Sequence, residues 1–468
     1  MHHNRFFSSA VSPAGVPLAA CALLLAALAP AAYPCHVPKD LRSHDPVGDD
    51  DPKLALMAHG GPREMITYTL EGATGCAGGQ ADIFDCSGLD LLAVVQLPAI
   101  GGGTGNDLWG WVDPVTNVEY ALMGRSNGVA VLDLSDPTAP VYAANLPTQT
   151  GSSTWRDVKV LGQYAYVVAD FNGAHGMQVF DLSALRGLTT TPATLAPVTV
   201  YDGLNRAHNL MINEDSDTAY AVGSETCAGG LHMIDLSTPT SPSFLGCFDA
   251  DGYTHDAQCV IYAGPAAAYQ GRELCFAANE DTLTVVDVTD KSNPVQLSRT
   301  TYEGSAYAHQ GWLTEDHRLF IQDDEIDEFN FGHNTRTYVW DVSDPANASM
   351  LNHFDADGPS VDHNQYVLGR YTYQANYRRG LRVLEIVDAA TGTLEEAAFF
   401  DTYPEADGNG FDGAWSTYPF LPSGLVLVSD INRGLFILRP TFRTPDGFVF
   451  GDGFESGSTS SWAETIAP

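Results

Sequence analysis

Four histidines recur along the chain at a nearly regular interval. His208, His255, His309 and His363 are separated by 47, 54 and 54 residues, and each lies at the start of a short segment with the composition of a β-strand. Imidazole nitrogens bind zinc, copper, iron and nickel, and a nearby acid such as Asp256 would widen the choice of metal. If the fold brings these side chains together, the sequence predicts a divalent-metal site or a site for a polar ligand.

A second pattern, which follows each of these segments along the chain, recurs about every fifty residues. Alternating apolar residues lead to an acid, a small apolar residue and a serine or threonine. The copies lie at 129–137, 177–185, 231–239, 283–291, 337–345 and 381–389, with a degenerate seventh at 435–440. We interpret the repeated acid as structural, because it can accept hydrogen bonds at the following turn. The period predicts an all-β fold, a seven-bladed β-propeller, in preference to a tandem of β-sandwiches.

The ends of the repeat region predict how the ring closes. The last repeat stops at Pro440 without a fourth strand, whereas LDLLAVVQLP (89–98) is a strand without a repeat of its own. We expect this N-terminal strand to be the outer strand of the seventh blade, which removes an exposed sheet edge. The propeller is expected to span residues 76–440.

The residues at the histidine register in the other repeats, and the residues that follow this register in all repeats, are mostly aromatic or polar. Strand residues alternate sides, so one set should face the central channel and the other a neighbouring blade. We assign the following residues to a binding surface at the channel mouth: Trp109, Arg156, Asp157, Asn209, Gln310, Asn364 and Trp415. The acidic run 322–328 lies on the same predicted face. It offers oxygen ligands for calcium, although a solvated acidic loop is the simpler interpretation.

These residues are consistent with two classes of function. The first is a binding scaffold in which a metal or polar ligand sits at the channel mouth. The second is a metal-dependent hydrolase or oxidase with Glu280 or Asp323 as the acid or base. A structural alternative applies to the histidines and amides themselves, since they can hydrogen-bond between blades. We favour the binding scaffold, because the sequence has no nucleophile elbow, phosphate-binding loop or HExxH motif.

Charge narrows the set of partners. The 468 residues include 58 Asp and Glu against 22 Lys and Arg, which gives a formal net charge of −36. Such a polyanion is repelled by nucleic acid and by anionic membrane surfaces, but it can bind cations. We expect a monomer whose partner is an extracellular ligand or a surface protein.

The two ends of the chain predict an extracytoplasmic location. Residues 1–32 resemble a secretory signal, with cleavage near Ala31 or Ala32, while Cys21 allows a lipoprotein alternative. Residues 33–75 and 441–468 are expected to be flexible, and the C-terminal segment has no apolar anchor. The expected protein is secreted or attached to the cell surface.

Cysteine spacing predicts disulfides in such an oxidising compartment. Cys35 is left over, and no CxxC spacing indicates a zinc–thiolate site. Neighbours in sequence pair plausibly as Cys76–Cys86, Cys227–Cys247 and Cys259–Cys275, and the last pair would face each other across a hairpin.

The repeats resemble LVIVD repeats, named for strands such as LTVVDV. Longer strings, among them SSTWRDVKV, AHGMQVFDL, YTHDAQCVIYAGP and NEDTLTVVDVTDKSNP, are similar to the choice-of-anchor B family of bacterial secreted or surface proteins. The resemblance covers roughly residues 70–440 and implies an extracytoplasmic propeller whose attachment device varies between members. It implies no catalytic activity. The chain departs from it after Pro440, where no apolar helix or basic stop follows.

Overall fold

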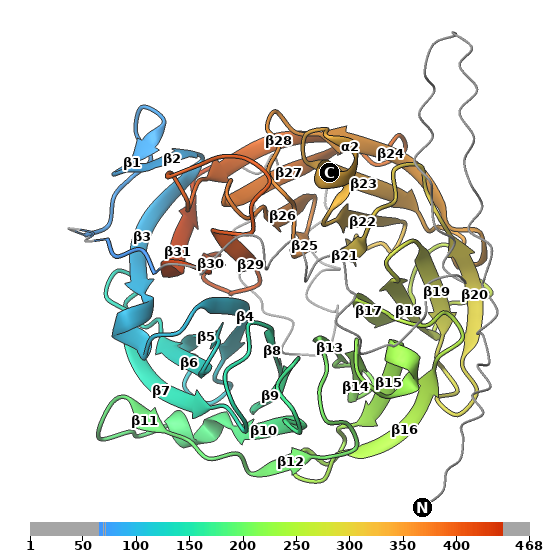
Figure 1. Cartoon of the computed structure of the whole chain (residues 1–468), viewed down its shortest axis with the longest axis horizontal. Coiled ribbons are helices and arrows are strands. Elements are labelled where there is room, and N and C mark those ends of the chain that lie inside the picture. Colours follow the sequence, from blue (N-terminus) through green and yellow to red (C-terminus); the bar gives the residue numbers. More distant parts are fainter. Residues whose placement is uncertain (1–64, 69, 71, 443–468) are drawn as a thin grey trace, which may run out of the picture. The chain divides into compact units, whose positions relative to one another are not determined.

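The computed structural model describes residues 65–68, 70 and 72–442, and within them seven β-sheets are arranged as blades around a central axis (Figure 1). The predicted seven-bladed β-propeller is therefore confirmed. The predicted signal, the alternatives at Cys21 and Cys35, and the tail from residue 443 onward lie outside the described residues. No helix within the described part of the chain has the length and apolar character needed to cross a bilayer.

The blades follow one another along the chain, and each runs from an inner strand at the axis to outer strands at the rim. The first blade contains β4 (Gly105–Val112), β5 (Glu119–Arg125), β6 (Gly128–Asp133) and β7 (Val141–Pro147), and the second contains β8 (Arg156–Leu161), β9 (Tyr164–Ala169), β10 (Met177–Asp181) and β12 (Thr199–Tyr201). The third blade contains β13 (Asn209–Asn213), β14 (Thr218–Val222), β15 (Leu231–Asp235) and β16 (Ser243–Phe248), and the fourth contains β17 (Asp256–Ile261), β18 (Glu273–Ala278), β19 (Leu283–Asp287) and β20 (Val295–Thr300).

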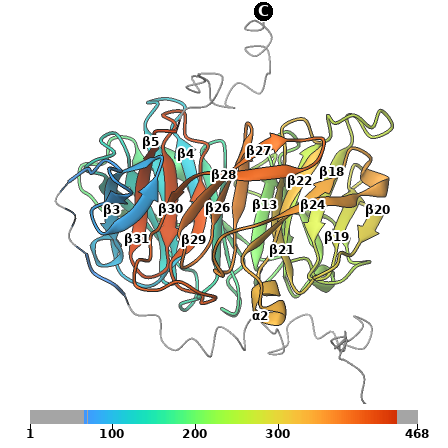
Figure 2. The ribbon, with the colours of Figure 1, turned by 90° about the horizontal axis from the view of Figure 1, so that it is seen from above.

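The fifth blade contains β21 (Ala308–Leu313), β22 (Leu319–Asp324), β23 (Arg336–Asp341) and β24 (Ser349–Asp355), and the sixth contains β25 (Gln365–Leu368), β26 (Tyr371–Ala375), β27 (Leu381–Asp388) and β28 (Thr393–Phe400). The seventh blade contains β29 (Ala414–Tyr418), β30 (Val426–Asp430), β31 (Gly434–Pro440) and β3 (Leu89–Gln96). Short 3-10 turns are η2 (Leu97–Ile100), η3 (Leu182–Leu185), η4 (Cys227–Gly229) and η5 (Pro345–Asn347). The one-turn helix α2 (Asp327–Phe331) projects beyond the strand ends on one face of the ring (Figure 2).

The seventh blade is closed by the N-terminal strand, as predicted. β3 pairs antiparallel with β31, from Leu89 opposite Pro440 to Gln96 opposite Gly434. Blue β3 and red β31 lie side by side in Figure 1. The predicted strand 89–98 ends two residues early, because Leu97 and Pro98 begin η2.

Two sheets have strands that the repeat pattern did not predict. β1 (Gln80–Ala81) and β2 (Phe84–Ser87) extend the sixth blade beyond β28, and β11 (Ala193–Thr194) pairs in parallel with β7 of the first blade. These strands have two to four residues. Segments this short are below the length at which alternation of apolar and polar residues is recognisable.

Burial follows from the position of each strand. The middle strand β18 is buried throughout, because blades cover both of its faces, whereas the outer strand β24 alternates between exposed and half-buried residues. The repeated acids end the third strands, where Asp133, Asp235 and Asp341 each accept a hydrogen bond from the backbone N–H two residues later. This is the predicted turn role, and it leaves the inner strands to position the site.

The three predicted disulfides are all present in the structure, between Cys76 and Cys86, Cys227 and Cys247, and Cys259 and Cys275. Cys259 and Cys275 are directly opposite each other on β17 and β18, as expected for a hairpin.

Candidate metal centre at the channel mouth

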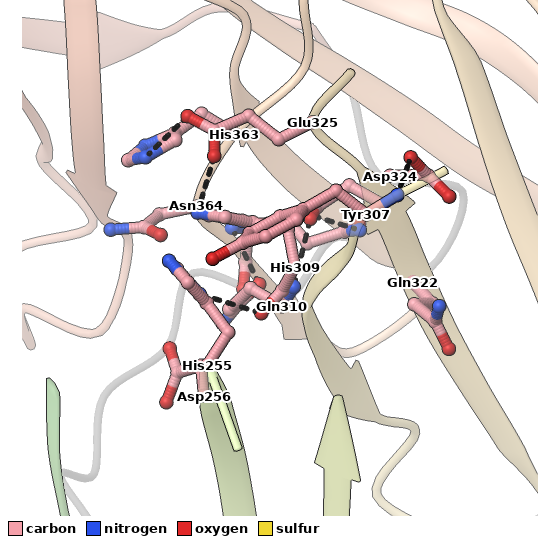
Figure 3. Close-up of polar contacts among 12 residues, drawn as sticks. His255, Asp256, Tyr307, His309, Gln310, Gln322, Asp324, Glu325, His363 and Asn364 are labelled. Carbon is pink, nitrogen blue, oxygen red and sulfur yellow. Dashed lines mark hydrogen bonds and ion pairs between the residues drawn. The ribbon is translucent and has the colours of Figure 1, made fainter. Parts of the chain in front are cut away.

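The four histidines lie side by side across neighbouring blades. The ring centroids of His208 and His255 are 4.4 Å apart, those of His255 and His309 are 4.1 Å apart, and those of His309 and His363 are 4.3 Å apart. All four belong to inner strands or to the residues that lead directly into them (Figure 3 shows the last three). The fold therefore brings together the imidazoles that the sequence places about fifty residues apart.

Hydrogen bonds at Nδ1 determine the tautomers of these rings. His255 donates from Nδ1 to the carbonyl oxygen of His309 at 3.0 Å, and His363 donates from Nδ1 to the carbonyl oxygen of Trp415. A carbonyl can only accept, so the proton of each neutral ring is on Nδ1 and the lone pair is on Nε2. In His309, Nδ1 lies 2.9 Å from Asp323 Oδ1, an oxygen that also accepts from the Gln310 N–H. Nε2 is therefore the nitrogen of each ring that could bind a metal.

Glu325 completes the cluster. Its Oε2 lies 3.5 Å from His309 Nε2, its Oε1 lies 3.6 Å from His363 Nε2, and Tyr377 donates its hydroxyl to Oε1 at 2.7 Å. One ligand atom from each of His255, His309 and Glu325 lies within 4.8 Å of the other two. Two imidazoles and a carboxylate form a donor set that suits a divalent transition metal.

Three residues of the predicted metal set lie outside this group, namely His208, Asp256 and His363, although His363 contacts Glu325 as described above. His208 is adjacent to His255, but its Nδ1 lies 3.0 Å from Asp170 Oδ2, and it is not one of the three grouped donors. Asp256 follows His255 on the strand, and its carboxylate is turned away from Glu325 (Figure 3). Burial raises the pKa of Asp256 to about 7. The direction of the Asp256 side chain follows from alternation along the strand, since consecutive residues such as His255 and Asp256 face opposite sides.

The sequence pointed to Glu325 only as part of the acidic run 322–328. In the structure, Asp323 orients His309, Asp324 accepts from two backbone N–H groups and the Tyr302 hydroxyl, and Glu325 faces the imidazoles. The interpretation of this run as a solvated loop is wrong, because all of its acids are at most 2% exposed. No sequence signal distinguishes the roles of these three consecutive acids, which depend on the direction of each side chain.

Asp323 and Glu280, the two predicted acid–base residues, lie in different surroundings. Asp323 is completely buried, burial raises its pKa well above the usual range, and its Oδ1 already accepts two hydrogen bonds. It is thus a positioning residue for His309. Glu280 has a φ of 60° and pairs through its backbone with Ala308, next to His309.

The other predicted surface residues form two layers. Arg156 lies between the first two blades, where it donates to the Arg125 carbonyl at 3.0 Å, and Trp415 packs on His363 with centroids 4.9 Å apart. Asn209 donates to the His255 carbonyl at 2.9 Å, and Gln310 donates to the Gln365 carbonyl at 3.0 Å. These contacts join neighbouring inner strands, as expected from the structural alternative.

Asn209 and Gln310 follow the histidine register directly, as Asp157 and Asn364 do, and this next register forms a charged layer on the side of the inner strands opposite the histidines. Lys159 Nζ lies 2.9 Å from Asp107 Oδ2 and also pairs with Asp157, while Asn364 of the sixth blade reaches Asp107 Oδ1 of the first at 3.4 Å. Burial would lower the pKa of Lys159, but the charges of Asp107 and Asp157 outweigh it and raise that pKa. A contact between blades one and six shows that this layer faces the channel.

The predicted register of the first blade is wrong by three residues. Trp109 lies in the channel layer, 4.8 Å from Lys159 Nζ and 5.8 Å between ring centroids from Tyr366. The residue at the histidine register is Asn106. The preceding Gly105 N–H donates to the seventh blade, as the Ala308 N–H before His309 donates to the fourth. The spacing of 47 residues from Trp109 to Arg156 fits the blade period, but the backbone pairing sets the register.

Apolar side chains cover the metal cluster. Tyr307, Ile326, Tyr377, Phe411 and Trp415 belong to one buried hydrophobic group, in which Tyr307 packs on His255, and Tyr377 and Trp415 pack on His363. The three donor residues of the cluster are at most 1% exposed. The centre is therefore enclosed, and its electrostatic interactions are only weakly screened by water.

Comparisons with known proteins identify the repeats. Three segments, 119–148, 153–185 and 273–301, match the model of the LVIVD repeat. They lie in the first, second and fourth blades. No curated protein matches the chain.

Solved structures with a similar fold include the β-propeller domain of Cps50 (Swd1) from Myceliophteria thermophila. It is 12% identical, covers 75% of this chain and 98% of its own, and has a TM-score of 0.48. A protein from Lactobacillus plantarum is 14% identical, covers 70% and 90%, and has a TM-score of 0.48. The computationally designed protein Ika8 is 11% identical, covers 71% and 82%, and has a TM-score of 0.42. The seven sheets of the structure and the three matched segments together identify the chain as a seven-bladed β-propeller that carries LVIVD repeats.

Proposed function

We propose that the protein is an exported binding scaffold that holds a divalent transition metal at its channel mouth through His255, His309 and Glu325. The observation that carries this proposal is the convergence of two imidazoles and a carboxylate within 4.8 Å of one another. The donors come from the fourth and fifth blades, so a bound ion would link two repeats of the propeller.

The donor spacing suits a small cation. Tetrahedral ligands at zinc bond lengths of about 2.0–2.1 Å lie about 3.4 Å from one another. The separations of 3.5 Å between His309 Nε2 and Glu325 Oε2 and of 3.6 Å between His363 Nε2 and Glu325 Oε1 are close to that value. Small side-chain movements would bring these atoms into coordination, with His363 as the fourth ligand.

The surroundings of the donors also favour a metal. A ligating histidine usually donates its second N–H to a carboxylate or carbonyl, which fixes the ring and raises its basicity. His309 bonds Asp323 and His255 bonds a carbonyl in this way. Nitrogen donors select transition metals over calcium, whose ligands are oxygens.

Burial distinguishes the binding scaffold from the hydrolase or oxidase. A substrate would have to displace the apolar cover to reach donors that are at most 1% exposed. The catalytic alternative rests on the number of donors, because three protein ligands leave a coordination position for water or substrate. Azide added to the cobalt-loaded protein decides between them. A changed visible spectrum supports an open position, and an unchanged spectrum supports the four-ligand scaffold.

The metal site is tested by elemental analysis and cobalt titration of protein purified without chelators. We expect one equivalent of metal, and a cobalt spectrum typical of four-coordination. His309→Gln and Glu325→Gln conserve size and should weaken binding at least tenfold. The matched control is His353→Gln, since His353 lies on outer strand β24 and its side chain is 40% exposed. Wild-type protein that binds no metal, or variants that bind as the control does, would refute the proposal.

Export is supported by the three disulfides and by the apolar run 18–32. N-terminal sequencing of protein from the expressing cells should find a mature chain that begins just after Ala31 or Ala32. A lipid on Cys21 would support the surface lipoprotein instead, and a chain that retains residues 1–32 in the cytoplasm would contradict export. Membership of the choice-of-anchor B family is proposed on the sequence strings alone.

A further inference from the structure

A tyrosine of the sixth blade contacts two residues of the histidine cluster at once. Tyr377 lies in the loop after β26 and is completely buried. Its hydroxyl donates to Glu325 Oε1 at 2.7 Å, and its ring centroid lies 4.7 Å from that of His363. Glu325 belongs to the loop after β22 of the fifth blade, so this hydrogen bond crosses from one blade to the next.

The backbone and the ring of Tyr377 together fix the position of its hydroxyl. Its carbonyl oxygen accepts hydrogen bonds from the N–H groups of Gly380 at 3.0 Å and Ala414 at 2.9 Å. Its ring packs edge-on against Phe411, with 5.2 Å between the centroids. A side chain whose conformation is locked by packing can hold a partner in one geometry. The hydroxyl is therefore already in place for Glu325 before any ion binds.

This hydrogen bond makes the two carboxylate oxygens of Glu325 unequal. Oε2 lies 3.5 Å from His309 Nε2 and Oε1 lies 3.6 Å from His363 Nε2, so both oxygens are near an imidazole nitrogen. A carboxylate can bind a metal through one oxygen or through both. Binding through both would turn Oε1 away from Tyr377 and leave a buried hydroxyl without its acceptor, which is unfavourable. The hydroxyl thus favours binding through Oε2 alone.

We propose that Tyr377 determines which metals the site accepts, because it keeps Glu325 bound through a single oxygen. This inference rests on the proposed metal site. One oxygen of Glu325 and the Nε2 atoms of the three neighbouring histidines give an ion four ligands, the number that zinc takes in closed sites. A second oxygen would add a fifth ligand and raise the share of oxygen donors, which suits manganese better. Tyr377 is therefore a positioning residue that acts on the ion through Glu325.

The chain offers a matched control for the removal of this hydroxyl. Tyr220 of the third blade is also completely buried, and its hydroxyl donates to Glu273 of the fourth blade. Tyr377→Phe and Tyr220→Phe therefore remove the same group from the same kind of hydrogen bond, the first at the histidine cluster and the second in another part of the ring. A merely structural role of Tyr377 predicts that both variants lose stability and that neither changes how a metal is bound.

The experiment uses the whole mature protein saturated with cobalt, as wild type, Tyr377→Phe and Tyr220→Phe. We expect the strong visible absorption of four-coordinate cobalt in the wild type and the control, and the weaker absorption of five-coordinate cobalt in Tyr377→Phe. In competition titrations, the preference for zinc over manganese should fall about tenfold in Tyr377→Phe and stay unchanged in Tyr220→Phe. X-ray absorption of the zinc-loaded wild type should count four nitrogen or oxygen ligands, and this measurement needs no variant.

Two results would overturn this inference alone. The first is a cobalt-saturated Tyr377→Phe variant with the spectrum and the metal preference of the Tyr220→Phe control. The second is a zinc-loaded wild type with five or six ligands, and this count decides the matter if Tyr377→Phe does not fold. Wild-type protein that binds no cobalt would overturn the proposed metal site and this inference with it, so the two failures are distinguishable.

Discussion

Closure of the ring by β3 predicts a large effect from one side chain. Leu91 lies on β3 directly opposite Leu438 of β31, and both are completely buried in one core that also contains Phe84 and Phe436. Leu91→Ala removes three carbon atoms, which costs about 2.5 kcal/mol in transfer free energy at about 0.8 kcal/mol for each. The cavity adds about 24 cal/mol per Å³, so the total is about 3–5 kcal/mol.

The assay is urea unfolding followed by tryptophan fluorescence. Because β3 and β31 close the ring, we expect one cooperative transition whose midpoint falls, and deletion of 85–98 should destabilise the whole domain more strongly. Leu351→Ala is the matched control: it is the same substitution on outer strand β24, where Leu351 is 37% exposed, and it should cost under about 1 kcal/mol. A Leu91→Ala cost equal to that of the control would refute the argument that β3 is an integral strand.

Two further predictions concern buried charges. Burial raises the pKa of Asp430 to about 6, so ionisation opposes folding, and between pH 4 and 6 the free energy of unfolding should fall by about 2 kcal/mol from this group. Asp430→Asn should remove that fall in urea titrations at pH 4 and 7, and an unchanged pH dependence would contradict the assignment. Lys159→Met leaves Asp107 and Asp157 buried without their cation, which should cost about 3–5 kcal/mol in the same assay. Adding Asp157→Asn to Lys159→Met should recover part of that loss. A Lys159→Met variant as stable as the wild type would show that the ion pairs of Lys159 are not needed for stability.

The fold was predictable because a propeller repeats one local pattern. The marker acids fix the period, the missing fourth strand after Pro440 points to the strand at 89–98, and neighbouring cysteines pair within blades. Each of these inferences depends on spacing within a single repeat or on the number of strands. The short strands β1, β2 and β11 escape such reasoning, since they are additions to individual blades.

The site was predictable only to the level of the inner-strand register. The sequence brings His255 and His309 together because their registers match, and the fold gives them a common environment. It does not select Glu325 from its acidic neighbours, and it groups Asp256 with the histidines although that side chain faces the channel. Direction along a strand is settled by alternation once the register is known, whereas direction in a loop depends on local backbone angles.

Equal rotation from blade to blade explains why the imidazoles form an evenly spaced row. Residues at one register of successive inner strands are related by the same rotation, and the ring separations of 4.4, 4.1 and 4.3 Å follow from it. The row ends where the register residue changes to Arg156 on one side and Trp415 on the other. A metal site also requires donor atoms that point toward one place. Glu325 supplies such a donor, because its carboxylate oxygens lie 3.5 Å from His309 Nε2 and 3.6 Å from His363 Nε2. The chemistry of the site therefore depends on one loop, at which the repeat symmetry is broken.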